Sequence, residues 1–261
     1  MSAMNIAIIG AGAMGGAVAD GLLHAGVEPG RIALSNPHPS KLARFTEAGV
    51  RTYVDNHNAI GGADIVILAV KPWVLPDVLR EIKADINYSR QEVAVIVAGV
   101  SCHDLCAMAD KNGKLPALSV VMPNTAVALG ESMTFVVAAH GQPAGALDIF
   151  GHLGRVMEIP EKQLGAATAL ASCGIAYAMR YVRAAEEGGV ELGFRAADAR
   201  AIVVETLRGA AALLARDGAH PECEIDKVTT PGGLTIRGLN AMEQAGFTSA
   251  VIAGLKASQP Q

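Results

Sequence analysis

Two glycine-containing loops, far apart in the sequence, hold the residues whose types and spacing could do chemistry. The first is Gly10-Ala11-Gly12-Ala13-Met14-Gly15, which directly follows the apolar run 6–9. At this spacing Gly10 allows a tight turn, Gly12 lets the backbone approach a pyrophosphate, and Gly15 lets the next helix pack on the strand. The free N–H groups of that helix would then face the phosphates of a dinucleotide. Glycine-rich turns also occur for packing alone, but the strand before this loop and the amphipathic helix after it favour a dinucleotide site.

The end of the second predicted strand, residues 31–34, bears on which dinucleotide is bound. An NAD site usually has Asp or Glu here to accept a hydrogen bond from the ribose 2′-hydroxyl, whereas a 2′-phosphate repels a carboxylate. This chain has Ser35 and Asn36 instead, and the segment that runs on to Lys41 contains no carboxylate. The segment therefore favours NADPH. The alternative is that Ser35 and Asn36 only form a turn and that Lys41 is a solvated helix residue.

Composition and charge exclude several classes of protein. The chain has 261 residues, of which 51% are hydrophobic and 4% aromatic, and its net charge is −4. It is long enough for two domains with aliphatic cores, and it has no basic region for nucleic acid. No apolar stretch is long enough to span a membrane, and the first strand begins at Asn5 without room for a signal peptide, so we expect a cytoplasmic protein.

Four cysteines raise the question of a metal site. Cys102 and Cys106 flank His103 at a spacing that could place two ligands on one helix. No second cluster with ligand spacing completes a site, and Cys173 and Cys223 stand alone. We therefore predict no metal, and free cysteines in a reducing compartment.

Strands and helices alternate in the first part of the chain. Further strands are predicted at residues 52–54, 64–70, 93–98, 117–121, 134–138 and 156–159, with helices at 74–86, 104–111 and 144–152. This alternation predicts a Rossmann-like, doubly wound, mainly parallel α/β sheet. Ligands bind beyond the carboxyl ends of such strands, where Lys71-Pro72, Gly99-Val100-Ser101 and Pro123-Asn124-Thr125 would lie.

The pattern changes at about Pro160, after which helices replace strands. They are predicted at 162–187, 195–216, near residue 224, at 234–245 and at 248–257. The predicted domains are therefore a dinucleotide-binding domain at 1–160 and an all-α domain at 161–261. Thr206 and Gly209-Ala210-Ala211-Ala212 give the second domain a small-residue face for close helix packing, and its broad apolar surface indicates an oligomer interface. A purely internal helical core is the alternative.

The second loop, Thr229-Thr230-Pro231-Gly232-Gly233-Leu234-Thr235, interrupts this helical region. On its own it could be a simple helix start, because Ser or Thr at the N-cap followed by Pro in the first turn is a common signal. Its meaning therefore depends on the rest of the sequence.

Considered as a whole, the chain resembles the pyrroline-5-carboxylate reductases, the last enzymes of proline synthesis, along nearly all of its length. The glycine loop is generic, whereas the segments at 121–125 and 230–236 are more specific. The matching segments are Gly10-Ala11-Gly12-Ala13-Met14-Gly15, Ala69-Val70-Lys71-Pro72, Ala98-Gly99-Val100-Ser101, Val121-Met122-Pro123-Asn124-Thr125, Glu205-Thr206-Leu207-Arg208-Gly209-Ala210-Ala211 and Thr230-Pro231-Gly232-Gly233-Leu234-Thr235-Ile236.

The resemblance implies hydride transfer from NAD(P)H to the imine carbon of Δ1-pyrroline-5-carboxylate, which gives proline. A protonated imine already accepts hydride well, so the protein must mainly hold the two rings together and fix the carboxylate, without a strong general base. The resemblance places the carboxylate on backbone N–H groups of Gly232 and Gly233, and the imine nitrogen near the catalytic hydroxyl of Thr235. It also implies a homodimer or larger homo-oligomer in which the helical domain of one subunit completes its neighbour's site. Beyond the glycine loop and the Ser35-Asn36 pair, the implied cofactor residues are Ala69, Val70, Lys71, Pro72, Ala98, Gly99, Pro123 and Asn124.

Three departures from the family pattern bear on the substrate. Cys173-Gly174-Ile175-Ala176 stands where the family usually has Ser-Gly-Pro-Ala, Ala126 replaces a usual proline, and Leu234 replaces a small or hydroxyl residue. Each makes the pocket more apolar, so a related cyclic imine is an alternative substrate. Another alternative is a β-hydroxyacid dehydrogenase. Such an enzyme would need a catalytic lysine inside the long helix that opens the second domain, whereas Lys162 stands at the very start of that helix. A third is a non-catalytic NADP-binding protein, which would not need to keep the second loop.

Overall fold

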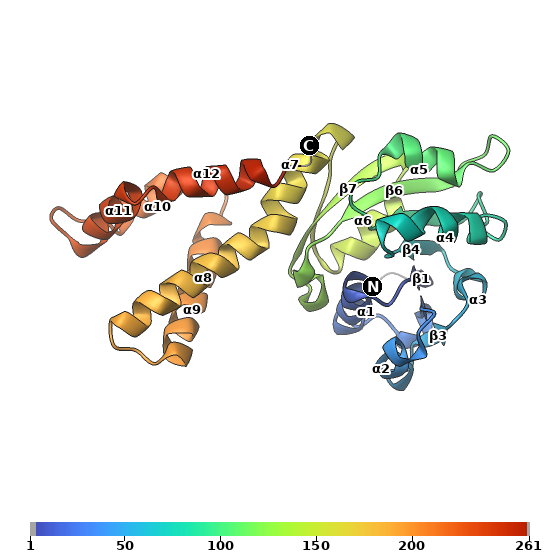
Figure 1. Ribbon diagram of the computed structural model, residues 1–261, viewed down its shortest axis with the longest axis horizontal. Helices are drawn as coiled ribbons and strands as arrows, with labels where there is room; N and C mark the ends of the chain where they lie inside the picture. The colour runs from blue at the N-terminus through green and yellow to red at the C-terminus, as the bar shows by residue number, and fades with distance from the viewer. Residues whose placement is uncertain (1–3, 260–261) are drawn as a thin grey trace. The chain divides into compact units, whose positions relative to one another are not determined.

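The computed structural model describes residues 4–259. These residues form two compact units, the first ending at Ser172 and the second comprising residues 173–259. As Figure 1 shows, the strands of the described residues all belong to the first unit, and the second unit is helical.

The first unit is built around one eight-stranded sheet. Its strands are β1 (Ile6–Ile9), β2 (Ile32–Ser35), β3 (Arg51–Tyr53), β4 (Ile65–Leu68), β5 (Glu92–Val95), β6 (Ala117–Met122), β7 (Ser132–His140) and β8 (Gly154–Glu158). Their order is β3-β2-β1-β4-β5-β6-β7-β8, and every neighbouring pair is parallel except β6 and β7. Ile9 aligns with Ser35 and with Leu68, so β1, β2 and β4 end at the same edge. The predicted mainly parallel α/β sheet is confirmed.

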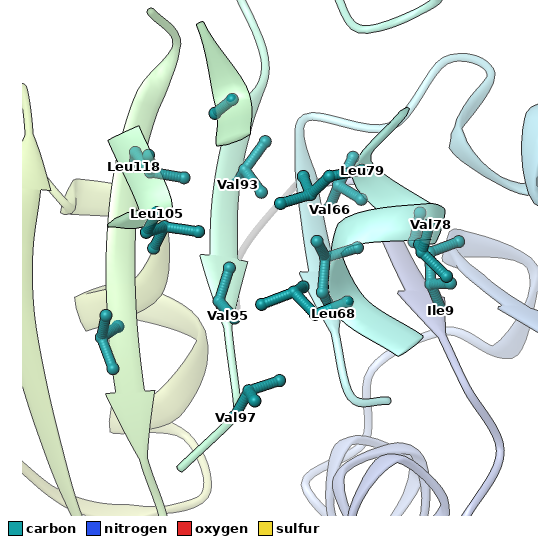
Figure 2. Close-up of a cluster of buried hydrophobic side chains, with 14 of the residues drawn as sticks. Ile9, Val66, Leu68, Val78, Leu79, Val93, Val95, Val97, Leu105 and Leu118 are labelled. Atoms are coloured by element: carbon teal, nitrogen blue, oxygen red, sulfur yellow. The ribbon is translucent and has the colours of Figure 1, made fainter. Parts of the chain in front are cut away.

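Helices cover both faces of this sheet. One face carries α1 (Ala13–His24), α2 (Ala43–Glu47) and α6 (Ala144–Gly151), and the other carries α3 (Asn56–Ile60), α4 (Leu75–Ile82) and α5 (Cys102–Ala109). Because side chains alternate along a strand, Val66 and Leu68 of β4 face α4, whereas Ile65 and Ile67 face the opposite layer. Figure 2 shows the α4 side of this core. Strands that are apolar on both faces bury the sheet between two helical layers.

Several helix boundaries differ from the prediction. The helix expected at 74–86 is a 3₁₀ turn, Pro72–Val74, followed by α4. The helix expected at 104–111 begins at Cys102, because the Ser101 hydroxyl caps it by accepting the Asp104 N–H at 3.0 Å. The helices α2 and α3 were not predicted, since five residues are too few to show a helical period.

The segment between β8 and the second unit also departs from its prediction. In place of one helix over 162–187, the chain forms a 3₁₀ turn (Glu161–Gln163), α7 (Leu164–Ala167) and a π-helical turn (Thr168–Cys173). Single π turns within helices recur at functional sites. Here the turn brings the Ser172 hydroxyl to 3.4 Å from the Pro123 carbonyl, so this segment is attached to the loop after β6.

The second unit contains five helices within the described residues: α8 (Gly174–Glu191), α9 (Ala196–Leu214), α10 (Pro221–Lys227), α11 (Leu234–Gln244) and α12 (Phe247–Ala257). α8 and α9 pack closely where Gly189 meets Ala199, because a Cβ on Gly189 would lie 2.8 Å from the Ala199 Cβ. Glu186 of α8 accepts two hydrogen bonds from Arg200 of α9, both at 3.2 Å. Among all described helices, none has the length and apolar character that a membrane span requires.

The second unit has almost no interior of its own. Among its described residues only Glu186 and Ala199 are buried. Large apolar side chains are exposed along its helices and the loops between them, namely Tyr177, Met179, Tyr181, Val190, Leu192, Phe194, Ile202, Val204, Leu213, Leu214, Val228, Leu234, Met242, Phe247, Val251 and Ile252. The alternative of a purely internal helical core is therefore wrong, and an exposed surface with this many large apolar side chains is typical of a protein interface.

Candidate cofactor and substrate site

The first glycine loop has a backbone that only glycine can form. Gly10 directly follows β1 with φ +104, and a Cβ there would lie 2.5 Å from the Ala69 carbonyl oxygen. A Cβ on Gly15 would lie 1.9 Å from the Gly10 carbonyl oxygen. Because both obstacles are backbone atoms, these glycines let α1 begin directly at the edge of the sheet.

The start of α1 is a ready anion site. Its first backbone bond runs from the Gly16 N–H to the Gly12 carbonyl at 2.9 Å, so the N–H groups of Ala13, Met14 and Gly15 have no acceptor among the described residues. Neither a capping side chain nor an acidic residue occupies this first turn. A Cβ on Gly12 would meet no atom within 4 Å, so the space above Gly12 is open. Free N–H groups and the helix dipole favour a phosphate here.

A cavity of about 520 Å³ adjoins this anion site. It is lined by Ala11, Gly12, Ala13, Ser40, Lys41, Ala43, Arg44, Phe45 and Glu47. Arg44 is held by Asp20 through hydrogen bonds of 2.9 and 2.7 Å and lies over the Phe45 ring. Lys41 has no partner among the described residues, so its ammonium is the cation that this cavity leaves for a ligand.

The pair at the end of β2 acts differently from the prediction. Ser35 is fully buried, and its hydroxyl donates to the Asn56 side chain at 2.7 Å, so it shapes the loop and does not point to solvent. Asn36 folds back on its own turn, where its side-chain oxygen accepts the His38 N–H at 3.0 Å and leaves its amide nitrogen without a partner among the described residues. Asn56 was not predicted as a site residue from the sequence. Its only local signal was the preceding Asp55, which caps α3 by accepting the His57 N–H.

The other predicted cofactor residues lie in loops at the carboxyl ends of β4, β5 and β6. Ala69 continues the sheet by donating to the Ile9 carbonyl at 2.9 Å, and Lys71-Pro72 enters the 3₁₀ turn. Ala98 and Gly99 precede α5, with Gly99 at φ +79. Pro123 follows β6 and accepts from Ser172. The parallel register therefore brings Ala69–Pro72 and Ala98–Gly99 to the edge that also holds the glycine loop.

Asn124 is fixed by its own hydrogen bonds at the end of β6. It is buried, its side-chain oxygen accepts the Ala126 N–H at 3.0 Å, and its own N–H donates to the Ser132 hydroxyl at 3.2 Å. Its side-chain nitrogen has no partner among the described residues. Asn124 thus caps the 3₁₀ turn that follows and keeps one donor for a ligand.

Glu161 anchors the loop that contains Ala98 and Gly99. Its carboxylate accepts the Cys102 N–H at 2.6 Å, which satisfies a first-turn donor of α5 from a residue far along the chain. Burial, together with the Glu161 charge, raises the pKa of the Cys102 thiol to about 11. Cys102 is therefore a protonated, unreactive thiol at neutral pH.

One further side-chain cluster was not singled out from the sequence. Ligand atoms of Asp55, His57 and Glu81 lie within 4.8 Å of one another, a spacing that a metal ion could bridge. His57 Nδ1 also lies 2.5 Å from Asp85, and that hydrogen bond raises the pKa of His57. When protonated, His57 pairs with the carboxylates of Glu81 and Asp85, as in a surface ion-pair network.

The second glycine loop contradicts one of its interpretations and changes one residue's part in the other. Gly233, and neither threonine, is the N-cap of α11, so the simple Thr-Pro helix start is wrong. The Gly233 N–H donates to the Thr230 carbonyl at 2.9 Å, so it is not available to a substrate carboxylate. A Cβ on Gly233 would lie 2.5 Å from the Thr230 hydroxyl, which explains the need for glycine there. Gly232, at φ +73, keeps a free N–H.

Thr235 lies in the first turn of α11 and is exposed. Its hydroxyl has no partner among the described residues, and no side chain caps the helix. The loop therefore presents a hydroxyl, the Gly232 N–H and the unpaired first-turn N–H groups of α11.

Comparison with known proteins places both units in one family. Residues 161–261 match the family model described as pyrroline-5-carboxylate reductase dimerisation, and residues 5–101 match that described as NADP oxidoreductase, coenzyme F420-dependent. Pyrroline-5-carboxylate reductase 2 of Dictyostelium discoideum is 34% identical over 96% of this chain and 89% of its own length. The chain belongs to the pyrroline-5-carboxylate reductase family. The β-hydroxyacid dehydrogenase alternative is thereby displaced.

Two further pyrroline-5-carboxylate reductases extend the comparison. Reductase 1 of Dictyostelium discoideum is 38% identical over 97% of this chain, which spans only 48% of that relative's length. A crystal structure of the Plasmodium falciparum pyrroline carboxylate reductase with NADP bound has the same fold, with a TM-score of 0.85 and 24% identity over 99% of this chain and 96% of the other. The reductase fold therefore consists of an NAD(P)-binding unit followed by a helical dimerisation domain. The predicted boundary at residue 160 and the cytoplasmic location stay predictions.

Proposed function

We propose that this protein reduces Δ1-pyrroline-5-carboxylate to L-proline with NADPH, as a pyrroline-5-carboxylate reductase of proline biosynthesis. The observation that carries the proposal is the full-length match to reductases, which covers the nucleotide-binding unit and the helical unit together. A non-catalytic nucleotide-binding protein would have no need to keep the second loop.

The residues of the first unit fit a dinucleotide. The free N–H groups of Ala13, Met14 and Gly15 bind the pyrophosphate, and the bare Gly12 backbone lets it approach. When bound, NADPH supplies the hydride that reduces the C=N bond. The loops at Lys71-Pro72 and Ala98-Gly99, with Pro123 and Asn124, hold the rest of the cofactor.

The preference for NADPH rests on the charges at the ribose end. Asn36 keeps an amide donor, and Lys41 brings an unpaired ammonium to the cavity beside Gly12. A 2′-phosphate gains from both groups, whereas the segment from Ser35 to Lys41 has no carboxylate to accept from a free 2′-hydroxyl. The NADP bound in the Plasmodium falciparum relative supports the same preference.

The second loop holds the substrate. The Gly232 N–H and the first turn of α11 fix the carboxylate, and the Thr235 hydroxyl hydrogen-bonds at the imine nitrogen. Gly233 contributes by its shape, because its N–H is used by Thr230. Positioning of this kind is enough for catalysis, since a protonated imine accepts hydride without a strong general base.

The test is NADPH oxidation by the purified protein, followed with Δ1-pyrroline-5-carboxylate, with a six-membered cyclic imine acid, and with NADH in place of NADPH. Rapid, saturable oxidation with the five-membered substrate supports the proposal. Faster turnover of the six-membered ring would mean that Cys173-Gly174-Ile175-Ala176 has changed the substrate. No turnover of either imine, with NADPH still bound, would rule out both.

We further propose that the protein is a homodimer or larger homo-oligomer whose sites combine two subunits. The exposed apolar side chains of α8, α9, α11 and α12 support this, because the second unit cannot bury them internally. Mixing the impaired variants Gly12→Val and Thr235→Ala, after subunit exchange, tests it, because a side chain at Gly12 meets no protein atom. If each site takes its nucleotide loop and its Thr235 loop from different chains, a mixed dimer regains one intact site, and an equal mixture recovers about one quarter of the wild-type rate. Sites contained within one chain would give no recovery.

A further inference from the structure

The only tryptophan of the chain, Trp73, lies next to the proposed cofactor site. It sits in the 3₁₀ turn Pro72–Val74 between β4 and α4, with 74% of its surface exposed. An indole offers a large rigid aromatic face and is the side chain most suited to stacking. Its position in the fold indicates which part of a bound cofactor could stack on it.

The first loop and the Trp73 loop diverge from neighbouring strands. α1 follows β1 and packs in the same core layer as Phe45 of α2. α4 follows β4 and packs in the opposite layer, with Ile60 of α3. The loops after β1 and β4 therefore turn to opposite faces of the sheet and leave a crevice between them, which is where open α/β sheets bind ligands.

Because the two loops diverge, the crevice has two walls. One wall carries the free N–H groups of α1 together with the end of β2 and Lys41. The other is built from the loops after β3 and β4, residues 54–56 and 69–74. A dinucleotide whose phosphates are held at the first wall must therefore turn its bases toward the second.

Three of the six large apolar side chains that the described part of the first unit exposes lie on the second wall, whereas Leu129, Met157 and Leu170 lie elsewhere. Among residues 4–128, the large apolar side chains that are exposed are Val54 at 63%, Trp73 at 74% and Val74 at 36%, and all three belong to this wall. Val54 follows Tyr53, which pairs with Ser35 at the end of β2, so it lies at the ribose end of the crevice. An apolar surface opposite a phosphate site matches the adenine end of a dinucleotide.

We infer that Trp73 stacks on the adenine of the bound cofactor and thereby sets the affinity for the adenosine end. The inference rests on the proposed nucleotide site but not on the identity of the imine. Stacking of one base on an aromatic side chain contributes enough to change affinity by about tenfold or more.

The experiment is a titration of tryptophan emission with 2′,5′-ADP, which has the adenine and the 2′-phosphate but no nicotinamide to quench by energy transfer. Because Trp73 is the sole tryptophan, any change in emission reports on this site alone. We expect saturable quenching by 2′,5′-ADP, and in calorimetry NADPH should compete with 2′,5′-ADP for binding. Reduced nicotinamide mononucleotide, which lacks adenine, should not compete.

Variants separate stacking from a structural effect. Calorimetry should show that Trp73→Ala binds 2′,5′-ADP about tenfold more weakly, whereas Trp73→Phe stays within about twofold because it keeps an aromatic face. Met157→Ala, which removes an exposed side chain from β8, is the matched control and should bind as wild type does. Both Trp73 variants should unfold at the wild-type temperature, since the side chain is mostly exposed.

The outcomes distinguish this inference from the proposed function. Unquenched emission together with wild-type affinity in Trp73→Ala would overturn the stacking, even in a protein that reduces the imine. Quenching by oxidised nicotinamide mononucleotide, whose ring does not absorb tryptophan emission, with no quenching by 2′,5′-ADP would place Trp73 at the other end of the cofactor and also overturn it. Quenching by 2′,5′-ADP in a protein that reduces neither imine would support the inference and refute the proposed function.

Discussion

Three glycines in and beside the first loop should respond to alanine in three different ways. A Cβ on Gly15 would lie 1.9 Å from the Gly10 carbonyl oxygen and 3.0 Å from the Ala69 Cβ, so α1 must shift away from the sheet. A Cβ on Gly12 would meet no protein atom within 4 Å, and one on Gly16 would only reach the Arg44 side chain at 3.5 Å. Alanine at Gly15 therefore tests backbone packing, and alanine at Gly12 tests the approach of the cofactor. Alanine at Gly16 is the control for both.

The expected magnitudes follow from these distances. Gly15→Ala should cost about 3 kcal/mol, the upper end for overpacking, and lower the Tm by roughly 6–12 °C. Gly12→Ala should keep its stability to within about 1 kcal/mol, the scale of an N-cap change, yet bind NADPH at least about tenfold more weakly, which is about 1.4 kcal/mol. Gly16→Ala, inside α1, should be stabilised by about 0.5–1 kcal/mol and bind NADPH normally.

Thermal unfolding and calorimetric NADPH binding on the same samples provide the test. Undiminished NADPH affinity in Gly12→Ala would mean that the pyrophosphate does not lie over Gly12, and the site assigned to the first loop would be refuted. An unchanged Tm in Gly15→Ala would contradict the close contact with the Gly10 backbone. Weakened binding in Gly16→Ala would show that any methyl group on α1 disturbs the loop, so that the effect at Gly12 could not be assigned to cofactor approach.

Three other predictions concern separate parts of the chain. Thr235→Ala should bind NADPH and fold as wild type does but turn over about 10²-fold more slowly, with Thr235→Ser restoring most of the rate, and an unchanged kcat would remove this hydroxyl from the mechanism. Glu92 is buried and accepts two N–H groups at the start of α6, so Glu92→Gln, whose amide turns a donor toward a donor, should lower the free energy of unfolding by about 1–3 kcal/mol, measured with urea. The hydrogen bond to Asp85 raises the pKa of His57 above 6.5, so the stability that this pair adds is fully present below that pH and is lost as the pH rises through the folded-state pKa. The urea midpoint should therefore fall more steeply over this pH range in wild type than in Asp85→Asn, and parallel curves would show that the pair is uncoupled.

Much of the fold and part of the site could be predicted from local sequence. The apolar runs of β1 and β4 predicted buried parallel strands, because strands covered on both faces need no polar alternation. The spacing from Gly10 to Gly15 predicted the start of α1, because a Cβ on Gly15 would collide with the Gly10 carbonyl a few residues earlier. The short helices α2 and α3 could not be predicted, since they have too few residues to show a period.

The sequence by itself determined the features that depend on short-range contacts: the alternation of strands and helices, the glycine loop and the change to helices near Pro160. The tertiary structure decided which distant residues meet. In the folded chain the Ser35 hydroxyl donates to Asn56, the Glu161 carboxylate accepts the Cys102 N–H, and the Gly233 N–H donates within its own loop. The tertiary structure also turned the loops after β1 and β4 to opposite faces, which leaves Trp73 exposed on a crevice wall. These pairings depend on how the strands are ordered in the sheet, and strand order is set by packing of the whole unit, which no local pattern of residues encodes.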